Sequence, residues 1–228
     1  DETVVGLSKQ SKNPRFAWDA YRRFIQMFGK VVLNVDEKVF DEAMAGKDMS
    51  DEKVLQKISA SFKSACEQKT GKKFPSDPYK QLELAIDAVF RSWMGRRAVE
   101  YRRQYRITPE IANGTAVTVV TMVFGNMGND SATGVVFTRD PEVGEKRLYG
   151  EYLVNAQGED VVSGKVTPQH IGALAKEMPD VYRDLLSVCN KLENHFKEPQ
   201  DVEFTVEKGR LYILQTRAGK MNAIAMVK

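Results

Sequence analysis

Two carboxylates and an amide near the C-terminal end of the sequence have the spacing of a metal-binding surface. Asp201 and Glu203 alternate with apolar residues, which puts both carboxylates on one face of a predicted strand. Gln215 and Arg217 share a face of the next predicted strand in the same way. Mg2+ takes one or two carboxylates together with phosphate oxygens. The pattern therefore suits a hard cation beside a phosphate-bearing ligand, and it equally suits ordinary cross-strand ion pairs.

Whether the two polar faces coincide depends on the turn between the strands. A two-residue turn at 208–209 pairs Glu203 with Leu214 and directs Gln215 to the opposite face. A three-residue connection pairs Glu203 with Gln215 and the other acid with Arg217. We predict the three-residue connection, because it collects all four polar groups on one surface. It leaves these side chains on the other surface: Val202, Phe204, Leu214 and Thr216.

Further acidic residues precede this pair of strands. Glu151 lies in a predicted strand with apolar neighbours, and Glu159 lies in the Gln-Gly-Glu-Asp segment over 157–160. His170 and His195 lie on predicted helices beside charged residues, which indicates exposed bystanders. No metalloprotease HExxH, Walker loop or dinucleotide GxGxxG motif occurs in the sequence. The acidic residues are therefore the main candidates for chemistry.

The first third of the sequence predicts helices with clear ends. Asn13 is a good helix cap and Pro14 suits the first helical position, and Asp77 with Pro78 repeats this pattern. Gly29 occurs where the first of these helices should end. The predicted helices span residues 14–29, 36–46, 50–71, 78–95 and 95–105. They favour a small antiparallel bundle and one longer helix that packs elsewhere.

Beyond residue 108 the spacing of apolar residues changes from about 3.6 to 2, which indicates strands. Val117, Val119, Thr121 and Val123 give the first predicted strand. Further strands are predicted over 134–138, 146–155, 202–207 and 211–217, with a helix that starts at 167–168 and restarts at Pro179. This half of the chain therefore belongs to the α+β class with a mainly antiparallel sheet.

Composition excludes several classes of protein. The 228 residues are 42% hydrophobic and 29% charged, with 16 Gly and 8 Pro, which excludes collagen and low-complexity disorder. No apolar run reaches the roughly 18 to 20 residues that span a bilayer. The formal charge of +3 is too small to indicate nucleic acid. Cys66 and Cys189 are far apart and outside any CxxC motif, so they predict two reduced, packed thiols in an intracellular protein.

The charge is unevenly distributed along the chain. Residues 1–108 contain 21 Lys/Arg and 15 Asp/Glu, and residues 109–228 contain 13 and 16, giving +6 and −3. The densest basic run is 96–106, where Tyr101 and Tyr105 separate the arginines. It indicates either a solvated helix face or a surface for polyphosphate or an acidic neighbouring domain. Because the sequence starts without Met, we expect an internal piece or a processed product.

Seven segments match the pattern of one known family, in order, over essentially the whole chain. They are Asn13–Ala17, Tyr21–Phe24, Met122–Asn126, Gly134–Arg139, Gly150–Val162, Asp201–Thr205 and Leu214–Arg217. With these segments the sequence resembles the nucleotide-binding domain of the pyruvate, phosphate dikinase family. The resemblance implies an ATP-grasp fold with an inserted helical subdomain. It assigns 1–76 to that subdomain, 77–123 to a helix and a strand of the N-terminal lobe, and 124–228 to the C-terminal lobe.

The resemblance also implies an activity, cofactors and partners. In this family ATP binds with Mg2+ between two lobes, and a mobile domain carries a phosphorylated histidine to a distant barrel where pyruvate binds. The overall reaction converts ATP, phosphate and pyruvate to AMP, pyrophosphate and phosphoenolpyruvate. A homodimeric full-length enzyme in the cytoplasm, or in an organelle, is implied, without nucleic acid or membrane as a partner.

Residue by residue, the resemblance implies Glu203 as the metal-binding carboxylate and Gln215 as its partner at the metal and the phosphates. Asp201 matches an adjacent acid that contacts ribose or metal, and Arg217 holds the acids in place. Glu203, Gln215 and Arg217 are the residues expected to serve catalysis. Six further residues are expected around the nucleotide, two as acids and four on a strand whose backbone meets adenine: Glu151, Glu159, Val120, Thr121, Met122 and Val123.

The departures from the family pattern limit what this chain is expected to do. The family's GGKG and SVRSGA segments, its histidine motif and its barrel are absent from the sequence. Val120 replaces a usual Gln, and Ala132 replaces a usual Gly and stiffens a phosphate-side loop. We expect a fragment of a dikinase that binds Mg-ATP weakly and does not catalyse the reaction by itself. The alternative is a naturally short, non-catalytic binding or scaffold module derived from the same fold.

Overall fold

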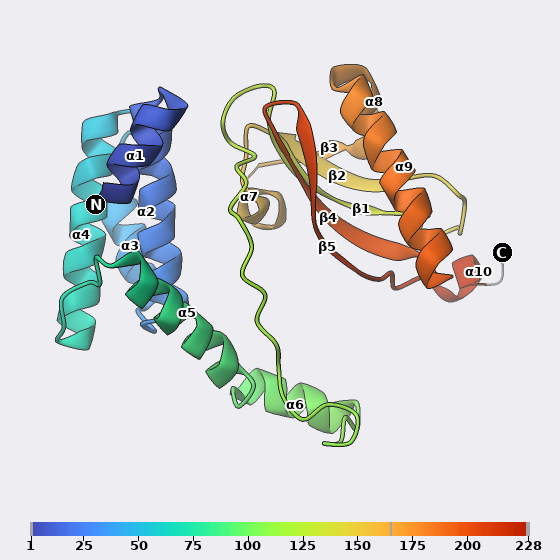
Figure 1. Cartoon of the computed structure of the whole chain (residues 1–228), viewed down its shortest axis with the longest axis horizontal. Coiled ribbons are helices and arrows are strands. Elements are labelled where there is room, and N and C mark those ends of the chain that lie inside the picture. The colour runs from blue at the N-terminus through green and yellow to red at the C-terminus, as the bar shows by residue number, and fades with distance from the viewer. Residues whose placement is uncertain (1, 165, 227–228) are drawn as a thin grey trace. The chain divides into compact units, whose positions relative to one another are not determined.

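The computed structural model of the chain describes residues 2–164 and 166–226. The chain divides into two compact units, one up to Val120 and the other from Thr121 (Figure 1). The first unit is helical and the second combines helices with an antiparallel sheet, so the predicted α+β class is confirmed. None of the helices in these residues has the length and apolar character needed to cross a membrane. The division of the chain at residues 76 and 123 stays a prediction.

The helical unit begins with four helices, one of which was not predicted. They are α1 (Glu2–Ser11), α2 (Pro14–Val31), α3 (Glu37–Met44) and α4 (Glu52–Thr70). The predicted start of α2 is confirmed, because the Asn13 side chain accepts a hydrogen bond from the backbone N–H of Phe16 at 3.0 Å. The predicted start of α4 at Ser50 is two residues too early, because α4 begins at Glu52. Asp51 caps this helix through the N–H of Lys53, while the Ser50 N–H donates to Asp48 in the preceding turn.

Gly29 does not end α2, which continues to Val31. A Cβ built on Gly29 would lie 2.6 Å from the Phe40 ring and 2.8 Å from Sγ of Cys66. Glycine is therefore required for close packing of α2 against α3 and α4. The core of this bundle consists of buried residues from these helices and the segments that follow α2 and α4: Ile25, Phe28, Val35, Phe40, Ile58, Phe62, Cys66 and Phe74.

Beyond the bundle, the chain forms two exposed helices and an extended segment. The helices α5 (Pro78–Ser92) and α6 (Arg96–Gln104) contain no buried residue. The strand predicted over 117–123 is wrong, because these residues belong to no strand in the described part of the chain. Val120, for example, is 74% exposed. A strand needs a neighbour for its backbone hydrogen bonds, and alternating valines alone do not supply one.

The second unit is built on one antiparallel sheet with the strand order β3-β2-β1-β4-β5. Its strands are β1 (Ala132–Phe137), β2 (Tyr149–Val154), β3 (Gln169–His170), β4 (Gln200–Glu207) and β5 (Arg210–Ala218). The helices α8 (Leu174–Glu177) and α9 (Pro179–Phe196) cover one face of this sheet (Figure 1). The buried core lies between them and includes Val136, Tyr152, Leu185, Val202 and Phe204. Three short elements complete the unit: α7 (Gly158–Val162), the 3-10 turn η1 (Ile171–Ala173) and α10 (Ala223–Met226).

The helix predicted from residue 167 is wrong at its start and confirmed from Pro179 onward. His170 belongs to β3 and pairs with Glu151 on β2, and its Nδ1 accepts the N–H of Gly172 at 3.1 Å. Residues 169–170 pair with the open edge of β2. A local helical pattern in the sequence does not reveal this pairing. His170 and His195 are both exposed, as predicted.

Candidate functional site

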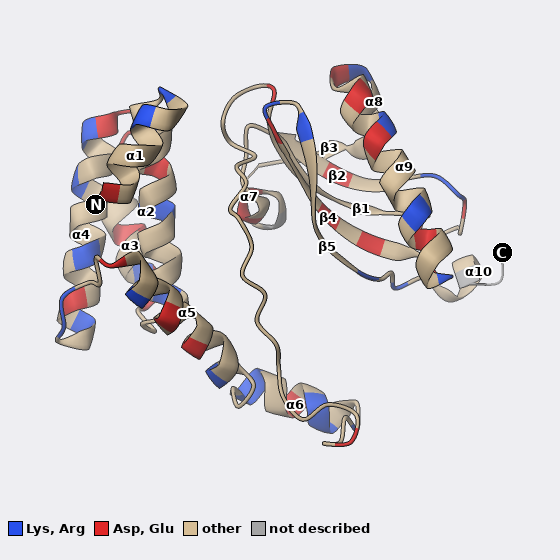
Figure 2. Cartoon of the chain, in the orientation of Figure 1, with Lys and Arg blue, Asp and Glu red and all other residues tan. Residues whose placement is uncertain are grey.

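The face of the sheet away from α8 and α9 carries the acidic residues singled out in the sequence. One row across the strands consists of Glu151 on β2, Val135 on β1, Glu203 on β4 and Gln215 on β5, each directly opposite its neighbour. Neighbouring strands lie about 4.8 Å apart, so Glu203 is one strand spacing from Gln215 and about 10 Å from Glu151. Figure 2 shows acidic residues on both β2 and β4. The row therefore brings three of the predicted residues to one surface.

Glu203 and Gln215 are paired as predicted, but not by the predicted connection. The turn contains only Lys208 and Gly209, with φ of 50° and 75°. The register then shifts between Glu203 and its neighbour on β4, where Leu214 is the extra residue of a β-bulge. Leu214 is 51% exposed, so its predicted place on the buried face is wrong. The bulge thus produces the pairing of Glu203 with Gln215 that we expected from a longer turn.

A second row places Asp201 opposite Arg217. Arg217 Nε donates to Asp201 Oδ2 at 2.8 Å. This hydrogen bond, together with the charge of Asp201, raises the pKa of the Arg217 guanidinium. The side chain of Asp201 is 13% exposed and that of Arg217 is 62% exposed. Arg217 is therefore the cation that fixes the orientation of the more buried acid.

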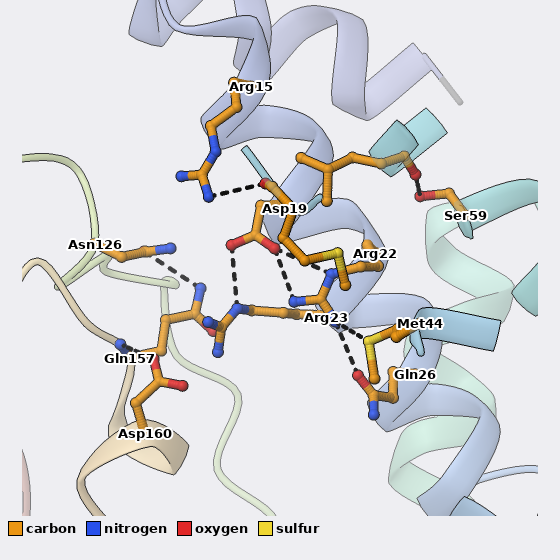
Figure 3. Close-up of polar contacts among 12 residues, drawn as sticks. Arg15, Asp19, Arg22, Arg23, Gln26, Met44, Ser59, Asn126, Gln157 and Asp160 are labelled. Carbon is orange, nitrogen blue, oxygen red and sulfur yellow. Dashed lines mark hydrogen bonds and ion pairs between the residues drawn. The ribbon is translucent and has the colours of Figure 1, made fainter. Parts of the chain in front are cut away.

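Glu159 lies apart from these rows, in the first turn of α7. This short helix packs beside β1 and β2, where Val161 contributes to a small apolar cluster. The segment before it is fastened by the Gln157 side chain, whose Nε2 donates to Asn126 Oδ1 at 3.3 Å (Figure 3). The Gln157 backbone N–H also donates to the Asp160 carboxylate at 2.9 Å. Glu159 is thus held near the loop that follows residue 123.

The segment expected to meet adenine reaches the sheet at its C-terminal end. The Phe124 N–H donates to Oε2 of Glu207 on β4 at 2.6 Å. Gly125 follows, and a Cβ there would lie 2.4 Å from the Ala156 carbonyl oxygen. Residues 120–123 are extended without strand pairing in the described part of the chain. Within the described residues, the contacts that fix this segment to the sheet therefore begin at residue 124.

Glu207 was missed in the sequence, although a simple signal marks it. It continues the alternation of Asp201 and Glu203 along β4, which places it on the same face of the strand. At this position it accepts the backbone N–H of Phe124. The sequence pattern could have identified the face, but not the backbone partner, which lies 83 residues away.

The donor set on this face suits Mg2+ only together with oxygen ligands from elsewhere. No group of three or more His, Cys, Asp or Glu side chains in residues 2–164 and 166–226 could hold a metal ion. Glu203 and Gln215 supply a carboxylate and an amide oxygen from adjacent strands. Mg2+ normally binds to one or two carboxylates and completes its shell with water and phosphate oxygens. The residues therefore fit a metal that arrives with a phosphate ligand, and not a closed protein cage.

Comparisons with known proteins agree with the motifs carried by these rows. Residues 30–187 and 178–228 match the family described as pyruvate phosphate dikinase, AMP/ATP-binding domain. A pyruvate, phosphate dikinase of Entamoeba histolytica is 54% identical over 239 residues, which cover all of this chain and 27% of the relative. The enzyme of that name from Clostridium symbiosum is 48% identical over 243 residues, again all of this chain and 27% of the relative.

A plant relative has a similar identity and coverage. The chloroplastic pyruvate, phosphate dikinase 1 of Oryza sativa is 48% identical over 237 residues, which cover all of this chain and 25% of the relative. The chain thus spans about a quarter of the length of the curated relatives that it matches. With a family match over more than half of its residues, this chain belongs to the pyruvate phosphate dikinase family of AMP/ATP-binding domains, which is of the ATP-grasp type.

Proposed function

We propose that the open face of the β3-β2-β1-β4-β5 sheet binds the phosphates of Mg-ATP as part of a pyruvate, phosphate dikinase. The pairing of Glu203 with Gln215 carries this proposal, because it presents two oxygen donors side by side on an exposed surface. Membership of an AMP/ATP-binding family supports the choice of nucleotide. In the complete reaction, ATP would phosphorylate a histidine on the way from pyruvate and phosphate to phosphoenolpyruvate, AMP and pyrophosphate.

Each polar residue of the two rows has a distinct role in this proposal. Glu203 and Gln215 hold the metal, with Glu203 contributing the only charge of that pair. When bound, Mg2+ neutralises charge on the phosphate oxygens during phosphoryl transfer. Arg217 holds Asp201 in a fixed orientation beside the metal ligands, where Asp201 contacts ribose or metal. Glu151, two strands away from Glu203, borders the nucleotide on the other side of β1.

Adenine is proposed to bind beside residues 120–123, with Glu159 at the neighbouring α7. The backbone of this segment would supply the polar contacts, which explains why Val120, Thr121, Met122 and Val123 need no particular side-chain chemistry. Phe124 and Gly125 fix its end against β4 and the segment before α7. A nucleotide would therefore extend from this segment across β4 toward β5.

The electrostatics of this face predict weak binding and a requirement for metal. Four acids on it are Asp201, Glu203, Glu151 and Glu207. The two cations of β5 on the same face are Arg217, which pairs with Asp201, and Arg210, which lies opposite Glu207. Free ATP is itself an anion and would be repelled. We propose that this chain alone binds Mg-ATP weakly, does not bind metal-free ATP, and does not turn over.

The remaining partners follow from the family and are part of the same proposal. A domain carrying the phosphorylated histidine and a barrel that binds pyruvate would complete the enzyme, as a homodimer in the cytoplasm or, as the name of the rice relative says of that protein, in a chloroplast. Nucleic acid and membranes have no role in this scheme.

Nuclear magnetic resonance of the 15N-labelled chain tests the proposal. Titration with ATP in the presence of Mg2+ should shift the amides of Glu203, Gln215 and residues 120–124. The same titration with EDTA should leave them unchanged. Shifts that do not depend on Mg2+, or shifts confined to α9, would contradict the proposed site. The absence of any shift up to 10 mM nucleotide would favour a scaffold module that has lost nucleotide binding.

A further inference from the structure

Glu207, the last residue of β4, connects the strand that carries Glu203 to the segment before β1. Its Oε2 accepts the backbone N–H of Phe124 at 2.6 Å, across 83 residues of sequence. This distance is short for an N–H···O hydrogen bond, as is usual when a carboxylate is the acceptor. Glu207 is half-buried, which limits competition from water. The contact is therefore a strong and directed link between two distant parts of the sequence.

The carboxylate of Glu207 makes this contact although a cation lies opposite it. Arg210 is its cross-strand neighbour on β5, but no ion pair joins the two side chains in the part of the chain that the structure describes. The Arg210 guanidinium lies 5.1 Å from the centre of the Tyr212 ring instead. One oxygen of Glu207 is thus directed at a backbone donor and not at the guanidinium.

The two residues after Phe124 are fixed as well. The N–H of Ala156 donates to the carbonyl of Gly125 at 3.0 Å, and Gly125 is buried. Asn126 Oδ1 accepts from Gln157 Nε2 at 3.3 Å (Figure 3). Three consecutive residues are therefore held, the first by β4 and the other two by the segment between β2 and α7.

Residues 120–123 have no such support. Their backbone N–H and carbonyl groups form no hydrogen bond with any of the described residues, and the Met122 side chain is 60% exposed. Backbone groups of this kind take their partners from water or from a ligand. The bond between Phe124 and Glu207 is the first anchor that follows them in the chain. Glu207 thus fixes the end of a segment whose own backbone is open to a ligand.

We propose that Glu207 is a positioning residue for the adenine end of the nucleotide site. Its hydrogen bond to Phe124 sets the position of residues 120–123 relative to Glu203. The two acids lie four residues apart on one face of β4, which is about 13 Å along a strand. The strand therefore fixes the distance between the proposed metal ligand and the proposed adenine segment. The effect on nucleotide affinity rests on the proposed function, whereas the anchoring of Phe124 does not.

Amide hydrogen exchange of the 15N-labelled chain tests the anchoring without a nucleotide. Glu207→Ala should speed exchange at Phe124 at least about tenfold, as for loss of a hydrogen bond to a charged group. Glu207→Gln keeps an acceptor oxygen on a side chain of the same length and should retain most of the protection. Glu198→Ala removes an exposed carboxylate beyond α9 and should change nothing.

Two results of this exchange experiment would overturn the proposal. One is equal exchange at Phe124 in the unchanged chain and all three variants. The other is a loss of protection along the whole of β4 in Glu207→Ala, which would show that the carboxylate supports the sheet in general.

Binding of two probes by calorimetry tests the effect on the nucleotide. Mg-ATP contains adenine, whereas magnesium tripolyphosphate contains only the phosphates. Glu207→Ala should raise the dissociation constant of Mg-ATP at least about fivefold, because at least one backbone residue must then be ordered on binding. The same variant should bind magnesium tripolyphosphate as the unchanged chain does. Glu207→Gln should restore the affinity for Mg-ATP, and Glu203→Gln should weaken binding of both probes.

The outcomes separate this proposal from the proposed function. Equal losses for both probes in Glu207→Ala would show an effect on the phosphate end or on the fold, and would overturn the positioning role. Equal affinities of the unchanged chain for the two probes would show that adenine makes no contact, so the positioning role would be wrong while the metal site stands. Binding of neither probe would refute the proposed function and the effect of Glu207 on affinity, and the exchange experiment would still decide the anchoring of Phe124.

Discussion

Gln215 lies directly opposite Glu203 although the turn between their strands has only two residues. A regular hairpin with this turn would place Leu214 opposite Glu203. The bulge at Leu214 absorbs one residue and moves the two oxygen donors onto one face. The proposed metal site therefore depends on a local irregularity of β5 that lies five residues from the turn.

This relationship predicts unequal effects for two single-residue deletions. Deletion of Leu214 removes the bulge and keeps Gln215 opposite Glu203, so the hairpin should become regular and the free energy of unfolding should change by less than about 1 kcal/mol. Deletion of Thr216 keeps that pair but moves Arg217 to the buried face, which should cost about 2 kcal/mol or more. Cross-strand nuclear Overhauser effects between residues 203 and 215 report the register, and urea denaturation reports stability. Loss of the contact in the Leu214 deletion would contradict the proposed role of the bulge.

Substitution of Gly29 by alanine should produce a packing defect in the helical unit. Gly29→Ala introduces a methyl group 2.6 Å from the Phe40 ring and 2.8 Å from Cys66 Sγ, which should destabilise the bundle by about 1 to 3 kcal/mol. Gly6→Ala in α1 is the matched control, since no atom lies within 4 Å of its added Cβ. That change should be neutral or stabilise by up to about 1 kcal/mol. Denaturation followed by circular dichroism distinguishes them, and equal stabilities would refute the close approach at Gly29.

The Asp19–Arg22 ion pair predicts acid sensitivity of the same unit. Arg22 Nη2 lies 2.7 Å from Asp19 Oδ1, and Arg23 approaches the other oxygen at 3.3 Å (Figure 3). Burial raises the pKa of Asp19, but the two arginines outweigh burial and the pKa lies below its usual value. The stabilisation is therefore complete above the unfolded pKa of about 3.9 and is lost as pH falls through the lower, folded value.

Asp19→Asn should abolish this part of the acid dependence. At pH 7 the variant should be less stable by about 3 kcal/mol, because it leaves a buried arginine without its carboxylate. Between pH 4 and pH 2 its stability should fall less steeply than that of the unchanged chain. Parallel slopes for the two proteins would show that Asp19 does not titrate with folding.

The two thiols should be unreactive in the folded chain. Burial raises the pKa of Cys66 to about 11 and that of Cys189 to about 12. At pH 8 both thiols are therefore protonated as well as shielded, and the reactive thiolate is scarce. Ellman's reagent should label neither cysteine in buffer and both in 6 M guanidinium. Rapid labelling of one cysteine in buffer would show local opening around it.

The sequence predicted features whose causes are local, and missed those that depend on distant partners. Asn13 and Asp77 cap their helices because each side chain reaches an N–H two or three residues ahead. The prediction of a strand over 117–123 is wrong, because no local signal reveals whether a neighbouring strand is present. His170 was assigned to a helix because its pairing with Glu151 is decided by the edge of β2, 19 residues earlier in the chain.

The proposed site shows the same division. The alternation along β4 was sufficient to place Asp201 and Glu203 on one face, and the requirement for a shared polar surface identified Gln215 and Arg217 as their partners. The turn length was wrong because a bulge and a longer turn produce the same pairing at Glu203. The burial of Leu214 was wrong for the same reason. Only the path of the backbone distinguishes a two-residue turn with a bulge from a three-residue turn without one.

The proposal that Glu203 helps to hold the metal of Mg-ATP is tested by calorimetry. Mg-ATP is titrated into the unchanged chain and into the Glu203→Gln variant. Glu198→Gln, at an exposed acid beyond α9, is the matched control. We expect weak, Mg2+-dependent binding by the unchanged chain and by the control. Glu203→Gln should raise the dissociation constant about tenfold or more, as for loss of a charge-assisted contact. Identical affinities for all three proteins, or tight binding without Mg2+, would contradict the proposal.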